Sequence, residues 1–143
     1  MEKAPEKQSI DRRVVIEMLQ RHDVTPTQQR VEIAQMLFAR PQHLSADQLL
    51  AQVNSESNHV SKATVYNTLN LFARKGLVRE VIVDPSRVFY DSNTSQHHHF
   101  FNVDTGELTD VPLPTLSMEQ LPSLPQGTVA AGVDVIIRLR SAD

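Results

Sequence analysis

The spacing of apolar residues changes at Gly76, and this change constrains the fold of the 143-residue chain more than any other feature. Before Gly76, apolar residues recur every three or four positions, which is typical of amphipathic helices. After Gly76 they alternate with polar residues, which is typical of strands with one buried face. We therefore predict an α+β fold whose first part is helical and whose later parts contain strands.

Four segments before Gly76 carry signals for the start or end of a helix. Thr25 is the predicted N-cap of the second segment, with Pro26 at the first helical position. Ser45 and Gln48 have the spacing of a capping box at the start of the third. Gly76 is a natural stop for the fourth. The predicted helices lie within residues 10–22, 24–40, 43–53 and 61–76.

The segment LVREVIVDPSRVFYD, residues 77–91, predicts two strands joined at DPSR. Helices followed by such a hairpin form a winged helix-turn-helix, in which the helix before the hairpin reads DNA. We assign residues 1–88 to a winged-helix DNA-binding domain. Residues 89–143 are assigned to a small α/β domain that holds the dimer together and senses a ligand.

The second part predicts strands in HHHFFNV and GELTDV with a turn at DTG, and a short helix near residues 117–121. In TVAAGVDVIIRLR, apolar residues alternate with polar ones, as expected of a strand. A module of this size has too small a core to be stable alone, so we expect it to pair with a second copy in a homodimer. The alternating apolar residues are Val133, Val135, Ile137 and Leu139.

Charge is distributed unevenly along the chain, whose net charge is -3. Residues 1–80 carry 11 Lys/Arg and 9 Asp/Glu, a net of +2, whereas residues 81–143 carry 3 and 8, a net of -5. A basic first part and an acidic second part suggest two different tasks. Neither a secretory signal nor an apolar run of membrane-spanning length is found, so we expect a cytoplasmic protein.

The predicted reading helix, SKATVYNTLNLFARK, places Val65, Leu69 and Phe72 on its buried face. Its other side chains include amides that can bond base edges and groups that can hold phosphates. Basic residues of the first two helices are further candidates for phosphate contacts. The predicted DNA-binding residues are Arg12, Arg13, Arg30, Lys62, Thr64, Tyr66, Asn67 and Asn70.

Three consecutive histidines, His97, His98 and His99, form the most unusual motif of the second part. On a strand, alternation puts His97 and His99 on one face and His98 on the other. A hairpin that turns at DTG would bring Asp110 back beside the pair. With Asp91 and His43, these side chains suit Fe(II), Mn(II) or Zn(II). The predicted metal ligands are His43, Asp91, His97, His99 and Asp110.

The order of TPTQQR, HLSADQL, ATVYNTLNLFARKGLV, VFYD, HHHF and GELTD resembles the ferric uptake regulator family of bacterial transcription factors. The resemblance covers roughly residues 14–140. It implies dimers with winged-helix DNA-binding domains, which bind a double-stranded operator, and α/β dimerisation domains. It also places an inter-domain regulatory metal site on the same five residues.

Two departures from the family pattern concern metals. Most of the family has a CxxC pair where Asn102 and Thr105 stand, and this chain has no cysteine, so a structural zinc held by four thiolates is not expected. The lack of cysteine, the HHH run and the ending VIIRLR are most similar to the iron response regulator branch of rhizobia and related alphaproteobacteria. That resemblance implies a regulator of iron and haem genes, active under low iron and inactivated when haem binds His97, His98 and His99.

Other functions remain open at this point. A Mn(II)- or Fe(II)-dependent regulator would use the same His and Asp residues without haem. A metal-dependent enzyme would use His97, His99 and a carboxylate, but no HExxH, phosphate loop or nucleophile motif accompanies them. A haem storage or transfer protein would not need the winged helix. We therefore expect a regulator and no enzyme activity.

Overall fold

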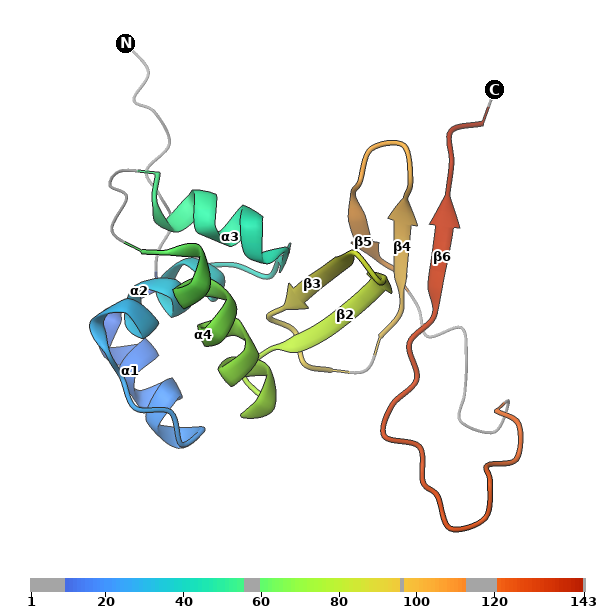
Figure 1. The fold of residues 1–143 in the computed structure, drawn as a ribbon, viewed down its shortest axis with the longest axis horizontal. Coiled ribbons are helices and arrows are strands. Elements are labelled where there is room, and N and C mark those ends of the chain that lie inside the picture. Colours follow the sequence, from blue (N-terminus) through green and yellow to red (C-terminus); the bar gives the residue numbers. More distant parts are fainter. Residues whose placement is uncertain (1–9, 56–59, 96, 113–120, 143) are drawn as a thin grey trace. The chain divides into compact units, whose positions relative to one another are not determined.

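The computed structural model describes residues 10–55, 60–95, 97–112 and 121–142. The chain divides into two compact units, Met1–Thr94 and Ser95–Asp143. The first contains helices α1 (Arg12–Arg21), α2 (Gln28–Leu37), α3 (Ala46–Val53) and α4 (Lys62–Arg74), with strands β1 (His43–Leu44), β2 (Arg79–Asp84) and β3 (Arg87–Asp91) (Figure 1). The second contains strands β4 (His99–Asn102), β5 (Leu108–Asp110) and β6 (Ile136–Leu139).

Side-chain capping at the start of α3 and backbone hydrogen bonds at the end of α4 define where these helices begin and end. Ser45 and Gln48 form the predicted capping box at the start of α3. At the other end of α4, Gly76 has a φ of 79°. Its N–H donates to Ala73 O at 3.2 Å, and Leu77 N–H donates to Phe72 O at 2.9 Å. This is a Schellman motif, and it turns the chain from α4 directly into the hairpin.

The core of the first unit lies among its four helices. Val65, Leu69 and Phe72 of α4 are fully buried, as their spacing predicted. They pack with Val15 and Leu19 of α1, and with buried side chains of α2 and α3. Because this stripe faces the core, the opposite side of α4 is left at the surface.

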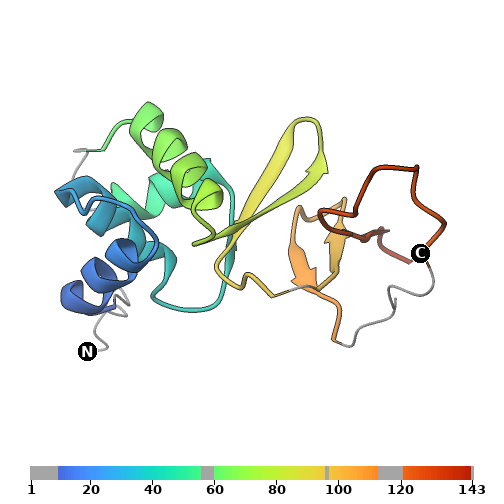
Figure 2. The same ribbon diagram turned by 90° about the horizontal axis from the view of Figure 1, so that it is seen from below.

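The hairpin of β2 and β3 rises from the end of α4 (Figure 2). Its turn is held by Asp84, whose Oδ1 accepts from Ser86 N–H at 2.8 Å and from Ser86 Oγ at 2.7 Å. These bonds hold the pKa of the Asp84 carboxyl below its ordinary value. Four helices with this hairpin confirm the predicted winged helix. The two-residue strand β1, which sequence analysis missed, pairs with β3 and gives the sheet order β1-β3-β2.

The second unit is a three-stranded sheet in the order β5-β4-β6. β4 pairs antiparallel with β5 across the predicted turn, and parallel with β6. Gly106 has a φ of 77° in this turn, a conformation that glycine adopts without strain. Among the described residues no further strand pairs with β6, which is therefore an edge strand of this sheet.

Three sequence predictions need correction. The second helix begins at Gln28 with Thr27 as N-cap, two residues later than predicted, because the Thr27 side chain accepts from Arg30 N–H. The strand predicted at the HHH run begins only at His99. The last strand covers only residues 136–139, and residues 121–135 form no regular element. The helix predicted near residues 117–121 lies outside the described residues except for Leu121.

The boundary between the two compact units falls after Thr94, six residues beyond the domain boundary predicted after residue 88. The reason is that β3 continues to Asp91 and pairs with both β1 and β2. Within the described residues, no helix combines the length and hydrophobicity needed to cross a bilayer.

Asn54, the C-cap of α3, offers a test of how α4 is positioned. Its Nδ2 donates to Val60 O at 2.7 Å, and its Oδ1 accepts from Val60 N–H at 3.2 Å. We predict that Asn54→Ala lowers the free energy of unfolding by about 1–3 kcal/mol, because two partly buried hydrogen bonds are lost. Urea denaturation measures this. Ser55→Ala, beside it on the surface, is the control and should change stability by less than about 0.5 kcal/mol; equal effects would contradict the role given to Asn54.

Candidate metal centre and nucleic-acid interface

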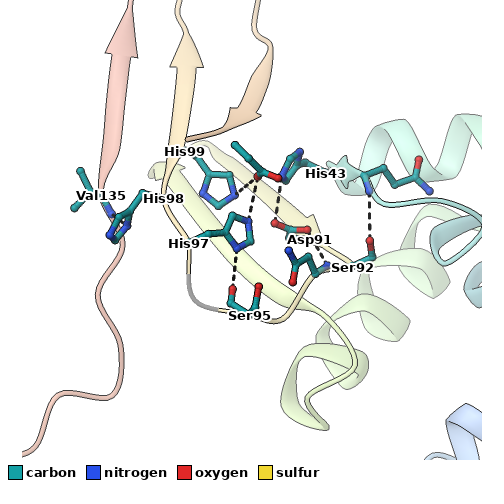
Figure 3. A network of polar contacts seen from close by, with 11 residues as sticks. His43, Asp91, Ser92, Ser95, His97, His98, His99 and Val135 are labelled. Carbon is teal, nitrogen blue, oxygen red and sulfur yellow. Dashed lines mark hydrogen bonds and ion pairs between the residues drawn. The ribbon is translucent and has the colours of Figure 1, made fainter. Parts of the chain in front are cut away.

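In the first unit, His43 and Asp91 stand opposite each other on β1 and β3. His43 Nε2 lies 3.2 Å from Asp91 Oδ2, and the Asp91 side chain is only 2% exposed (Figure 3). The other carboxylate oxygen accepts from Asn93 N–H at 2.9 Å. Burying a carboxylate is costly unless hydrogen bonds and positive charge compensate it, so this pair is a place where a cation would be stabilised.

In the second unit, His97, His99 and Asp110 converge. His99 faces Asp110 across β4 and β5. The same oxygen, Asp110 Oδ1, lies 3.1 Å from His97 Nε2 and 3.4 Å from His99 Nε2. The two imidazole centroids are 4.5 Å apart. Although His97 precedes the strand, the pair shares one side as alternation predicted, and the hairpin returns Asp110 to it.

The hydrogen bond at the far side of His97 determines what its Nε2 can do. His97 Nδ1 lies 2.8 Å from the carbonyl oxygen of Ser95, which can only accept, so Nδ1 carries a proton (Figure 3). In the neutral ring, Nε2 then points a lone pair at the Asp110 carboxylate. Two electron-rich atoms at this distance are stable together only with a cation, either a proton or a metal ion. Histidine ligands of metals are commonly held by this kind of Nδ1–H bond to a carbonyl.

His98 is placed differently from its neighbours. It is 7% exposed, and its Nδ1 accepts from Val135 N–H at 3.1 Å. Because a backbone N–H can only donate, the proton of the neutral His98 ring is on Nε2. In this tautomer neither ring nitrogen has a lone pair available for a metal.

The two positions of the family's CxxC pair, Asn102 and Thr105, form a hydrogen-bonded turn. Asn102 Oδ1 accepts from Asp104 N–H at 2.9 Å and Thr105 N–H at 3.1 Å. Asp104 Oδ2 in turn accepts from Ser141 N–H at 2.8 Å, which lowers the pKa of the Asp104 carboxyl. Side-chain oxygens therefore hold the hairpin turn and the end of the β6 segment together.

The predicted reading helix presents only some of its polar residues to the surroundings. Tyr66 and Asn67 are exposed, Tyr66 to 38%. Lys62 lies 3.4 Å from Asp47 and stands over the Tyr66 ring. Asn70 is also exposed, and its Oδ1 accepts from Tyr90 Oη at 3.3 Å, so one of its amide atoms is already bonded to the hairpin.

The remaining residues predicted to contact DNA also differ in how accessible their side chains are. Thr64 Oγ1 bonds Ser61 Oγ at 2.9 Å within the N-cap of α4. Arg30 donates from Nη1 to Thr25 O at 2.9 Å. Arg12 and Arg13 are exposed in the first turn of α1. Thr64 and Arg30 are half-buried, so accessibility favours the exposed residues Arg12, Arg13, Tyr66 and Asn67 over these two.

Sequence reasoning missed a cavity of about 360 Å³ beside Tyr66, between the start of α3 and the hairpin. Asp47, Arg87 and Tyr90 contribute to its lining. Burial, followed by the charge of Glu80, raises the pKa of the Tyr90 phenol. The cavity forms only when α3, α4 and the hairpin pack together, so no short motif signals it.

Comparisons with known proteins agree with this architecture. The sequence profile of the ferric uptake regulator family matches residues 21–129. The peroxide-responsive repressor PerR of Staphylococcus epidermidis is 32% identical over 119 residues, which cover 81% of this chain and 79% of that protein.

Solved structures show the same fold. The ferric uptake regulator from Pseudomonas aeruginosa with manganese has a TM-score of 0.67 at 24% identity, over 91% of this chain and 99% of that one. The Vibrio cholerae ferric uptake regulator has a TM-score of 0.71 at 19% identity, over 88% and 98%. Proteins of this family are transcriptional regulators and not enzymes. The winged helix, the His and Asp clusters and the matched profile together show that this chain belongs to the ferric uptake regulator family.

Proposed function

We propose that this chain is a metal-dependent transcriptional regulator that binds operator DNA when a divalent ion joins its two units. His43 and Asp91 of the first unit, with His97, His99 and Asp110 of the second, are the proposed ligands. The proposal rests on the contacts of His97. Its Nδ1–H donates a hydrogen bond to Ser95 O, and its Nε2 faces a carboxylate oxygen of Asp110. That arrangement calls for a cation, and a metal ion would supply the charge that both carboxylates require.

The short connection between the two groups of ligands supports a shared ion. His97 follows Asp91 by six residues, a span that can reach at most about 20 Å. Such a short connection keeps the two ligand groups at high effective concentration with respect to each other. An ion bound by both groups would restrict the angle between the DNA-binding unit and the rest of the protein, which links metal occupancy to DNA affinity.

The donor set limits the choice of metal. Three imidazoles and two carboxylates, with no thiolate, suit Mn(II), Fe(II) or Zn(II). Five ligands exceed the four that structural zinc sites usually take, which favours Mn(II) or Fe(II). The Pseudomonas aeruginosa regulator was solved with manganese, an ion of this class.

We propose α4 as the DNA-reading helix of a homodimer. Tyr66 and Asn67 would meet base edges, while Lys62, Arg12 and Arg13 would hold phosphates. In the second unit, Ile137 and Leu139 of β6 are 38% and 37% exposed on an open edge. A second copy covering this edge would bury them and place two reading helices on one operator. Such a regulator would act in the cytoplasm, where the operator is.

Haem is the second candidate signal. The haem proposal rests on the resemblance to the iron response regulator branch, in which low iron permits DNA binding and haem abolishes DNA binding. Three adjacent histidines favour it, with His97 the partly accessible member. Ligation by His98 would require its proton to move to Nδ1, which abolishes the bond from Val135 N–H. Haem binding through His98 would therefore loosen the second unit.

We predict that Mn(II) binds one site per chain and that His99→Ala or Asp110→Asn weakens binding by about 100-fold or more, since each removes a ligand. His43→Ala should weaken the same site, because it supplies a ligand from the other unit. Isothermal titration calorimetry measures both. Glu107→Gln, an exposed acid on the same hairpin, is the control and should bind normally. Unaltered affinity in His43→Ala would show that the two groups do not share an ion.

We predict that Asn67→Ala lowers discrimination between operator and random duplex by about 1–3 kcal/mol, because a base contact is lost. Lys62→Ala should weaken binding to all sequences and reduce the salt slope by about one. Fluorescence anisotropy with an operator selected from a randomised duplex library measures both. Lys75→Ala, at the other end of α4, is the matched control. If Lys75→Ala and Lys62→Ala lower the salt slope equally, α4 does not dock by its first turns.

We predict for the haem candidate that an absorbance titration of the wild type gives a ligated haem spectrum, and that added haem releases DNA. His98→Ala and the double variant His97→Ala/His99→Ala should each alter the spectrum if these residues ligate iron. Spectra and DNA release that are the same in all three proteins would exclude the HHH motif as the haem site.

A further inference from the structure

His98 lies at the centre of the second unit, between two proposed ligands. Its carbonyl oxygen accepts from Val111 N–H at 2.9 Å, next to Asp110 at the end of β5. On the other side, its Nδ1 accepts from Val135 N–H at 3.1 Å, and the adjacent His99 N–H donates to Val135 O at 3.2 Å. His98, just before β4, therefore bonds the segments on both sides of that strand, and Figure 3 shows its ring directed at Val135.

The contact with Val135 sets where β6 begins. Val135 immediately precedes β6, and the first register pair of β4 with β6 is His99 with Ile136. Residues 121–135 form no regular element, so the bonds to His98 and His99 are where this segment joins the sheet. Ordering β6 at this point costs conformational entropy, and the His98 bond offsets part of that cost.

We infer that His98 is a positioning residue, not a metal ligand, and that it couples occupancy of the His97, His99 and Asp110 ligand group to the ordering of β6. The inference rests on the proposed metal site. An ion fixes the main chain at residues 97 and 99, which orients the His98 ring toward Val135. By linkage, an ordered β6 must strengthen ion binding by the same factor.

Alternation and tautomer support this role. The His98 ring is directed to the side of the strand opposite His97 and His99, and its acceptor nitrogen is already used. Because β6 is an edge strand of the sheet as far as the chain is described, and presents Ile137 and Leu139, the coupling would reach the surface proposed to meet a second copy. Metal binding and dimerisation would then favour each other.

The test compares His98→Asn with His98→Leu in the full chain. Asn places Oδ1 where His has Nδ1 and keeps an acceptor for Val135 N–H, whereas Leu has none. We expect Mn(II) affinity near the wild-type value in His98→Asn and about tenfold lower in His98→Leu, with one ion bound in each case. In the wild type and His98→Asn, Mn(II) should slow amide hydrogen exchange in residues 135–139, and in His98→Leu it should not.

The Co(II) absorption spectrum separates positioning from ligation. We expect equal band positions in all three proteins, because His98 does not touch the ion. A shifted spectrum with lost affinity in both variants would make His98 a ligand and overturn the inference. Equal affinity and exchange in His98→Leu and wild type would also overturn it.

Two further outcomes remain informative. If His98→Leu does not fold, the wild type decides alone: exchange in residues 135–139 that Mn(II) leaves unchanged overturns the coupling. If the wild type binds no Mn(II), the proposed metal site itself fails, and the coupling with it. If the wild type binds Mn(II) and the His98 substitutions have no effect, only the coupling through His98 is overturned, and the metal site stands.

Discussion

In both units an imidazole and a carboxylate face each other across a pair of antiparallel strands. His43 stands opposite Asp91 on β1 and β3, and His99 stands opposite Asp110 on β4 and β5. Directly opposed residues of an antiparallel pair are close enough for their side chains to interact. A shift of either register by one residue would turn one partner to the other face. The chemistry of this protein therefore depends on two strand registers.

The position of α4 depends both on the packing of its apolar stripe and on hydrogen bonds at its two ends. Its apolar stripe is buried among the helices, and the Schellman motif at Gly76 directs the chain into the hairpin. Exposed Tyr66 and Asn67 follow from this geometry, because they lie away from the stripe. The same geometry brings exposed Asn70 to Tyr90, which donates a hydrogen bond to its Oδ1. A helix face is thus divided between DNA contacts and hairpin contacts only when the hairpin is in place.

Local patterns in the sequence predicted much of the fold and part of the site. Capping at Ser45, the stop at Gly76 and the hairpin at DPSR rest on interactions within a few residues, and each is found. The start of α2 was misplaced because Thr25 and Thr27 have equal capping chemistry, and the arrangement around Arg30 decides between them. Strand β1 is only two residues long, too short for any period to be visible.

The donor chemistry can be read from the amino-acid sequence: histidines and aspartates without a single cysteine, and alternation that separates His98 from His97 and His99. Which ring nitrogens keep a lone pair depends instead on contacts that form when the chain folds. Ser95 O accepts a hydrogen bond from the Nδ1–H of His97, whereas Val135 N–H donates one to the Nδ1 of His98. Three identical side chains in a row thereby acquire different roles. A neutral imidazole has one donor nitrogen and one acceptor nitrogen. Its hydrogen-bond partners determine which nitrogen carries the proton, and for His98 that partner, Val135, lies 37 residues away in the sequence.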